Sequence, residues 1–319
     1  MSNLGVPQRF LDLAEQARGP RALSEEGLRE HFGEPAKVEI EAGQVWRVHW
    51  GEVSALVLVL VVEDRDVLVA PVMIDPPAED DRSVVLEGSF TAFGVQATVW
   101  AGLTSAIPIR VLDRPVDEWS EVLVRWVTLT AQGLPSAIPS GTRQGREIQS
   151  ELDPAALIRA ELADDLESLR QAPGLPVATT GVTHRDLASL LGNNLDLAGL
   201  CSSLGLRQSE VMRILRGQTP LTPDQVEIVA RVTGLSSKGI ASTVRPLPLG
   251  LVVTVEHPRW RPIWARRAQR LHIGEDQARL TVGYGVFALA ARETGGGEPD
   301  WNQRLRQFLH QEETGAGGA

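Results

Sequence analysis

Residues 197–216 read LAGLCSSLGLRQSEVMRILR, and their apolar spacing is more specific than that of an ordinary amphipathic helix. Counted from Leu197, the fifth residue is the small Cys201 and the ninth is Gly205. Positions four, eight, ten, fifteen and eighteen are apolar: Leu200, Leu204, Leu206, Val211 and Ile214. A small residue lets two helices cross closely, and glycine accepts a left-handed turn, so the stretch predicts two helices joined by a tight turn.

The residues after this stretch predict a further helix. Thr222 is a good N-cap, Pro223 suits the first helical position, and Gly234 ends the segment. With these features, residues 184–242 resemble the lambda-repressor-like, or Xre-type, DNA-binding family. The resemblance implies that the second helix of the pair lies in the major groove, with its N-terminal residues at base edges.

The same resemblance implies which side chains meet DNA. Gln208 and Ser209 match the family's base-reading pair, and glutamine can bond both N6 and N7 of adenine. The other residues implied for the DNA face are Arg207, Met212, Arg213, Arg216 and Gln218. Two alternatives stay open: Gln208 and Ser209 cap the helix, or the whole motif is a helical hairpin without a role on DNA.

Charge is distributed unevenly along the chain. The 319 residues carry a formal net charge of −10, which alone argues against nucleic acid as a partner. Residues 207–272, however, hold 11 Lys/Arg against 4 Asp/Glu, a net of +7, whereas residues 1–183 hold 15 against 28, a net of −13. A basic stretch beside the motif favours DNA binding.

Further phosphate contacts are expected from cations outside the motif. These candidates are Lys238, Arg259, Arg261, Arg266, Arg267 and Arg270, with Trp260 and Trp264 among them. The alternative is an ordinary solvated helix face, with the two tryptophans in a core.

The N-terminal part predicts strands. Val-rich segments separated by turn signals occur at 38–50, 53–62, 67–74, 83–87 and 95–106. Five short strands at this spacing predict a small antiparallel barrel, and residues 116–132 predict an amphipathic helix that closes it.

Residues 40–130 resemble the PemK/MazF family of SH3-like barrels, which includes sequence-specific endoribonuclease toxins. The matching segments are 43–48, 67–72 and 100–111. In the toxins a long loop after the first strand delivers the catalytic arginine, whereas here Gly51-Glu52 leads directly into the next strand. Met73-Ile74-Asp75 stands where the toxins place Thr or Ser, and the acidic loop Glu79-Asp80-Asp81 is expected to repel RNA. We therefore expect a catalytically silent module for sensing, dimerisation or partner docking.

These observations predict a multidomain α+β chain: an N-terminal SH3-like antiparallel β-barrel, an all-α helix-turn-helix domain and a C-terminal helical domain. The expected divisions are a helical arm (1–37), the barrel with its closing helix (38–133), a linker and helix (134–182), the helix-turn-helix (183–243), the C-terminal helical domain (244–313) and a flexible tail (314–319). Residues 244–256 are expected to be strand-like.

The sequence thus predicts a sequence-specific regulator of double-stranded DNA. We expect a homodimer, because such motifs commonly read two half-sites, and a protein partner for the barrel. The dimer surface is either the barrel or the stripe Trp301, Leu305, Phe308 and Leu309, unless these belong to the core of their own domain. Two rivals stay open: a toxin–antitoxin fusion with a ribonuclease barrel, and a protein-interaction scaffold of a defence system.

No further chemistry is expected. The sequence has no motif for a metal, a nucleotide or another cofactor, and its lone cysteine cannot form an intramolecular disulfide. No signal peptide or apolar run of about 20 residues is present, so a cytoplasmic protein without membrane contact is expected.

Overall fold

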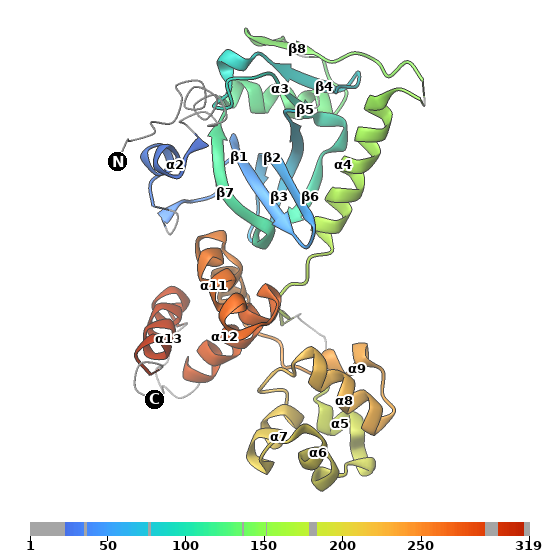
Figure 1. Ribbon diagram of the computed structural model, residues 1–319, viewed down its shortest axis with the longest axis vertical. Coiled ribbons are helices and arrows are strands. Elements are labelled where there is room, and N and C mark those ends of the chain that lie inside the picture. Colours follow the sequence, from blue (N-terminus) through green and yellow to red (C-terminus); the bar gives the residue numbers. More distant parts are fainter. Residues whose placement is uncertain are drawn as a thin grey trace, which may run out of the picture. The chain divides into compact units, whose positions relative to one another are not determined.

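The computed structural model describes residues 23–34, 37–75, 78–135, 137–150, 152–178, 184–290 and 299–315. The chain separates into two compact units, residues 1–172 and 173–319, which are described one at a time. Figure 1 shows a mixed α+β first unit and a helical second unit.

The first unit combines a sheet with three described helices. Its strands are β1 Gln44–Trp50, β2 Val53–Val62, β3 Asp66–Met73, β4 Ser83–Leu86, β5 Ala97–Trp100, β6 Ser105–Pro108, β7 Leu112–Glu118 and β8 Thr142–Gln144. Its helices are α2 Glu25–Phe32, α3 Glu121–Ala131 and α4 Pro154–Arg170. Helix α4 is capped by Asp153, whose side chain accepts a hydrogen bond from the Ala155 N–H at 2.9 Å.

All the strand pairs are antiparallel, in the order β7-β1-β2-β3-β5-β4-β8, with β6 paired to β3 beside β5. The β1–β2 hairpin pairs Trp50 with Val53 across a two-residue turn, in which Gly51 takes a positive φ of 58°. In the described residues β7 and β8 are the end strands of this order, so the antiparallel sheet is observed and closure into a barrel stays a prediction.

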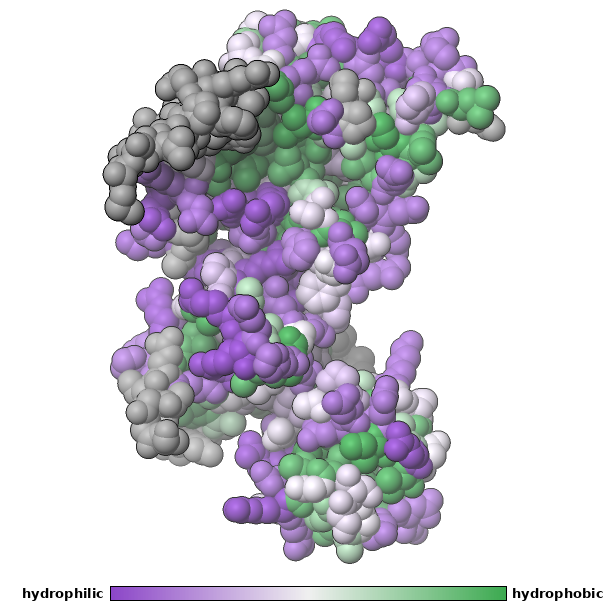
Figure 2. All heavy atoms as spheres, in the orientation of Figure 1, coloured by the Kyte–Doolittle hydropathy of each residue, from purple (hydrophilic) through white to green (hydrophobic). Residues whose placement is uncertain are grey.

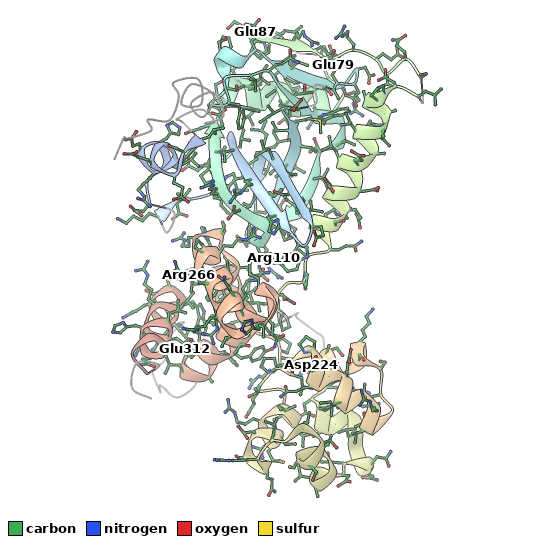
Figure 3. All side chains as sticks on the ribbon, in the orientation of Figure 1. Glu79, Glu87, Arg110, Asp224, Arg266 and Glu312 are labelled. Carbon is green, nitrogen blue, oxygen red and sulfur yellow. The ribbon has the colours of Figure 1, made fainter. Side chains whose placement is uncertain are left out.

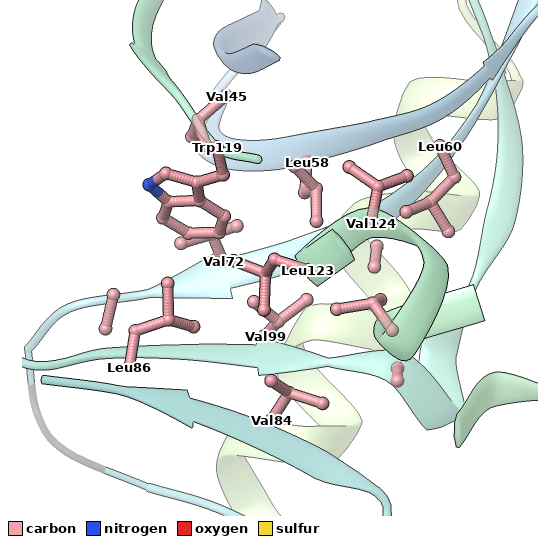
Figure 4. Close-up of a cluster of buried hydrophobic side chains, with 14 of the residues drawn as sticks. Val45, Leu58, Leu60, Val72, Val84, Leu86, Val99, Trp119, Leu123 and Val124 are labelled. Carbon is pink, nitrogen blue, oxygen red and sulfur yellow. The ribbon is translucent and has the colours of Figure 1, made fainter. Parts of the chain in front are cut away.

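Helices cover both faces of this sheet. Alternate residues of β2 divide between two cores: Leu58 and Leu60 belong to one, and Val57 and Val59 to the other. The first core, drawn in Figure 4, includes Leu123 and Val124 of α3. The second includes Leu166 and Leu169 of α4. Burial on both faces explains why the strands read as continuous Val-rich runs, without polar alternation.

Several predicted element bounds in this unit are wrong. Strand β1 begins at Gln44 instead of residue 38, and the predicted strand 95–106 is split into β5 and β6 by a short 3₁₀ turn, Ala101–Leu103. Residues 112–118 form strand β7, so the closing helix begins at Glu121 instead of residue 116. Residues 142–144, expected in a linker, form β8 and pair with β4.

The second unit contains nine described helices. They are α5 Leu187–Leu191, α6 Leu197–Leu204, α7 Gln208–Leu215, α8 Pro223–Thr233, α9 Ser237–Ala241, α10 Leu249–Glu256, α11 Arg261–Leu271, α12 Glu275–Ala290 and α13 Trp301–Gly315. Helices α5–α9 share one apolar core, and α10–α13 share another. On the face shown in Figure 2, apolar residues reach the surface of the α5–α9 bundle, whereas hydrophilic residues predominate around α11.

The chain enters and leaves the α5–α9 bundle at one place. Val177 and Leu247 form an isolated parallel bridge, and the Leu247 N–H donates to the Pro176 carbonyl at 2.8 Å. Leu175 and Leu247 both lie in the α10–α13 core. The bundle is therefore inserted between residues that pack together.

Predictions for the C-terminal segments need correction as well. Residues 249–256, expected to be strand-like, form α10, and α13 extends into the expected tail as far as Gly315. The stripe Trp301, Leu305, Phe308 and Leu309 packs into the α10–α13 core, so it is not an exposed dimer surface. Residues 1–22 and 35–36 of the predicted helical arm and residues 316–319 of the predicted tail lie outside the described residues. None of the described helices has the length and apolarity needed to cross a bilayer.

Candidate nucleic-acid interface

Helices α6 and α7 form the hairpin that the sequence predicts. Helix α6 is capped by Asp196, whose side chain accepts from the Gly199 N–H at 2.9 Å. It ends at Gly205, which has φ 65° and ψ 26°, the left-handed conformation expected of this glycine. The Leu206 N–H donates to the Cys201 carbonyl at 3.2 Å, which closes the turn before α7 begins.

The packing of the hairpin agrees with the predicted apolar positions. Leu200, Val211 and Ile214 are buried in the α5–α9 core. Leu204, Leu206 and Cys201 are half-buried against the same core. One face of α7 is therefore fixed against the bundle, and its other face is presented to solvent.

The solvent face of α7 begins with the predicted base-reading pair. Arg207 is the N-cap residue, and Gln208 and Ser209 occupy the first two helical positions, where both are exposed. The cap contact is made by Glu210, whose Oε2 accepts from the Arg207 N–H at 2.9 Å. Among the described residues, neither the Gln208 nor the Ser209 side chain makes a hydrogen bond, so the capping alternative has no contact in its favour.

Cations line the same face without carboxylate partners. Arg207, Arg213 and Arg216 are exposed, as is Gln218 just beyond the helix, and Met212 is half-buried. In the described part of the chain, none of the three guanidinium groups forms an ion pair. Unpaired arginines are available to phosphate oxygens at no cost of breaking an internal contact.

The predicted phosphate contacts outside the hairpin fall into two groups. Lys238 on α9 and Arg266 on α11 are exposed, and Figure 3 labels the latter. Arg261 is 5% exposed, and its Nε lies 3.3 Å from Glu275 Oε1. Arg267 pairs with Glu312 of α13, and Arg259 donates to the His257 ring.

Internal contacts of this kind compete with phosphate. When a buried guanidinium leaves its carboxylate partner, the carboxylate remains as an unpaired buried charge, which costs on the order of several kcal/mol. Arg261 and Arg267 therefore do not enter the interface proposed below. Trp260 and Trp264 lie in the α10–α13 core, which agrees with the alternative interpretation of this segment.

In the first unit, the residues compared with the toxin family take part in structural contacts. The β1–β2 turn has two residues, so no long loop extends from this hairpin. Arg47, the cation on β1, pairs with Asp113 of β7, and its Nε lies 2.5 Å from Asp113 Oδ2. The arginine thus joins two neighbouring strands.

Two of the three carboxylates in the acidic loop before β4, those of Glu79 and Asp80, are paired with arginines, whereas Asp81 is exposed. Glu79, labelled in Figure 3, forms ion pairs with Arg143 and Arg146, with 2.6 Å between the paired atoms of each, and accepts a hydrogen bond from Arg146 Nε. Burial opposes ionisation of Glu79, but the hydrogen bonds from Arg146 and Arg143 outweigh it and lower its pKa. Asp80 is 3% exposed; it pairs with Arg159 of α4 and accepts from the Ser83 hydroxyl. These ion pairs connect Arg143, Arg146 and Arg159 to the loop.

One group of residues was missed by sequence reasoning. At the C-terminal end of α7, Arg213 and Gln218 line a cavity of about 290 Å³ together with Arg245, Tyr284 and Phe287. Arg245 belongs to the basic stretch, but no local pattern connects it to residues 284 and 287. The cavity follows from tertiary packing within the second unit.

No family model matches the chain, and no curated protein sequence matches it significantly. Among solved structures, the chain is similar to an "Endoribonuclease in complex with its cognate antitoxin from Mycobacterial species". The match has 17% identity, covers 31% of this chain and 100% of the other, and has a TM-score of 0.25. A score at this level does not establish a shared fold.

Proposed function

We propose that this protein is a sequence-specific regulator that binds double-stranded DNA, with the N-terminal turn of α7 at base edges in the major groove. The observation that carries the proposal is the pairing of two features on one helix face. The side chains of Gln208 and Ser209 are exposed and make no hydrogen bond in the described protein. Arg207, Arg213 and Arg216 beside them have no carboxylate partner there. The likeness of residues 184–242 to lambda-repressor-like domains supports the same assignment.

The residues of this face would contact DNA in different ways. Gln208 and Ser209 read bases, because a glutamine amide can bond adenine at two points. Arg207, Arg213, Arg216, Lys238 and Arg266 supply charge for phosphates, and Met212 and Gln218 complete the contact surface. One such helix reads few base pairs, so specificity requires two half-sites and a homodimer.

The test begins with selection of bound fragments from genomic DNA, followed by binding measurements on the selected site and on unrelated DNA. The double variant Gln208→Ala, Ser209→Ala is expected to weaken specific binding roughly 10- to 100-fold, by the usual value of base contacts, and to leave nonspecific binding nearly unchanged. Affinity of the wild type is expected to fall steeply with salt.

A matched control is Ser202→Ala, Ser203→Ala, which removes two exposed hydroxyl groups from the neighbouring helix α6. We expect it to retain specific affinity. Equal losses on specific and unrelated DNA in the Gln208, Ser209 variant, or an affinity that does not respond to salt, would contradict the proposal.

For the first unit we propose a role in sensing, dimerisation or docking, without ribonuclease activity. The support is that Arg47 is paired with Asp113 and that the β1–β2 turn carries no long loop. The test is an RNA-cleavage assay on the full chain, because truncation near residue 135 would remove β8 and α4 from the sheet. No cleavage is expected, and cleavage abolished by Arg47→Ala would favour the rival toxin–antitoxin fusion.

A further inference from the structure

The cavity at the C-terminal end of α7 combines two cations with an aromatic wall. Arg213, on α7, and Arg245, between the α5–α9 bundle and α10, both line it, and Phe287 of α12 supplies a ring. No Asp or Glu is among the described residues that line it, and neither arginine has an ion pair in that part of the chain. The cavity therefore concentrates positive charge that no internal group neutralises.

The position of Arg245 is fixed by its own backbone. Its N–H donates to the Gly217 carbonyl at 2.9 Å, and its carbonyl accepts from the Tyr284 hydroxyl. Its guanidinium carbon lies 5.6 Å from the centroid of the Phe287 ring, within range of a cation–π contact. These contacts hold the cation and the ring together before any ligand arrives, which lowers the entropy cost of binding.

We propose that this cavity binds a small aromatic carboxylate. A volume of about 290 Å³ suits a ligand of one or two rings. Arginine forms paired hydrogen bonds with a carboxylate, and Phe287 offers its face or edge to the ligand's ring. An acyclic phosphate would use the charge but not the aromatic wall, whereas a carboxylate on a ring uses both features and matches the planar guanidinium groups.

Binding in the cavity is coupled to the DNA-binding face through Arg213. This residue lines the cavity and is also one of the unpaired cations of α7, so an anion that engages it withdraws it from phosphate. This coupling rests on the proposed function, whereas ligand binding itself does not. We therefore expect the aromatic acid to weaken binding of the full chain to DNA.

Ligand binding is measured first, without DNA, by fluorine NMR of 4-fluorobenzoate with the full chain, and 4-fluorobenzamide serves as the neutral control. The acid is expected to bind and the amide is not. Arg245→Gln and Arg213→Gln are each expected to weaken binding of the acid about tenfold or more, as for a lost charged hydrogen bond. Arg270→Gln, at an exposed position on α11, is expected to change the affinity for the acid less than twofold.

A second variant separates loss of the site from loss of the fold. Phe287→Leu keeps both cations and removes the ring. It is expected to weaken binding of 4-fluorobenzoate severalfold, whereas its melting temperature is expected to stay close to that of Arg270→Gln. Equal binding of acid and amide, no binding of the acid, or unchanged affinity in Arg245→Gln would overturn the proposed site.

The DNA measurement then tests the coupling alone. Saturating 4-fluorobenzoate is expected to reduce the affinity for the selected DNA site in the wild type but not in Arg245→Gln. If the ligand binds and DNA affinity does not change, the coupling is wrong and the site stands. If the chain fails to bind DNA at all, the proposed function fails and the ligand result is unaffected.

Discussion

Replacing Leu169 by alanine is expected to destabilise the first unit by about 2–5 kcal/mol, the usual loss for a fully buried leucine. Leu169 is 0% exposed and lies near the end of α4, where it packs with Val57, Val59 and Trp46 of the sheet. Truncation of a side chain in a packed core leaves a cavity, because the neighbouring side chains close it only in part. Helix α4 is thus part of the first unit's core.

Urea titration with hydrogen exchange read by mass spectrometry reports the two units separately, because each peptide belongs to one of them. The matched control is Leu157→Ala on the same helix, at a position 65% exposed, where a change below about 0.5 kcal/mol is expected. Equal effects of the two substitutions on the β1–β3 peptides would show that α4 does not stabilise the sheet.

Replacing Gly217 by alanine is expected to destabilise the second unit by about 2–5 kcal/mol, from two causes that act together. Gly217 has a φ of 67°, which penalises any side chain. A Cβ there would lie 2.6 Å from the Thr243 carbonyl oxygen and 2.9 Å from the Arg245 nitrogen, and both are backbone atoms. The Gly217–Arg245 hydrogen bond that supports the cavity would be displaced as well.

Gly234→Ala is the matched control for the backbone penalty. Gly234 has a φ of 74°, and a Cβ there would have no atom within 4 Å. It is expected to cost about 1–2 kcal/mol, from the left-handed conformation alone. The difference in the free energy of unfolding between the two variants, measured by hydrogen exchange in the peptides of the second unit, gives the cost of the steric clash at Gly217. No difference would mean that residues 243–245 do not pack closely on Gly217.

Local chemistry made some elements predictable from sequence. Gly205 ends α6 in the left-handed conformation, and Thr222 caps α8 with Pro223 at its first position, because each depends on residues a few positions away. The strand prediction for residues 249–256 is wrong, because their Val-rich run favours a strand by propensity, whereas packing against α12 and α13 favours helix α10. Tertiary burial overrode local preference there.

The residues of the candidate DNA face could be grouped from the sequence, because they are close together in the chain, on and just beside one short helix. The fate of the other cations was not, because their partners are remote in sequence: Glu275 for Arg261 and Glu312 for Arg267. Neutralisation of Glu79 by Arg143 and Arg146 likewise depends on β8 lying beside β4. Charge counted along a chain locates a basic segment but does not tell which of its cations are already paired.

The parallel bridge between Val177 and Leu247 affects which insertions and replacements of sequence the chain can accept. The residues that flank the α5–α9 bundle are neighbours in space, about 5 Å apart as paired strands are. A segment whose ends meet can be lengthened, replaced or exchanged for another without moving the residues that anchor it. On the proposed function, the helices that carry Gln208 and Ser209 are therefore a segment whose replacement would change the DNA target while the α10–α13 core keeps its residues.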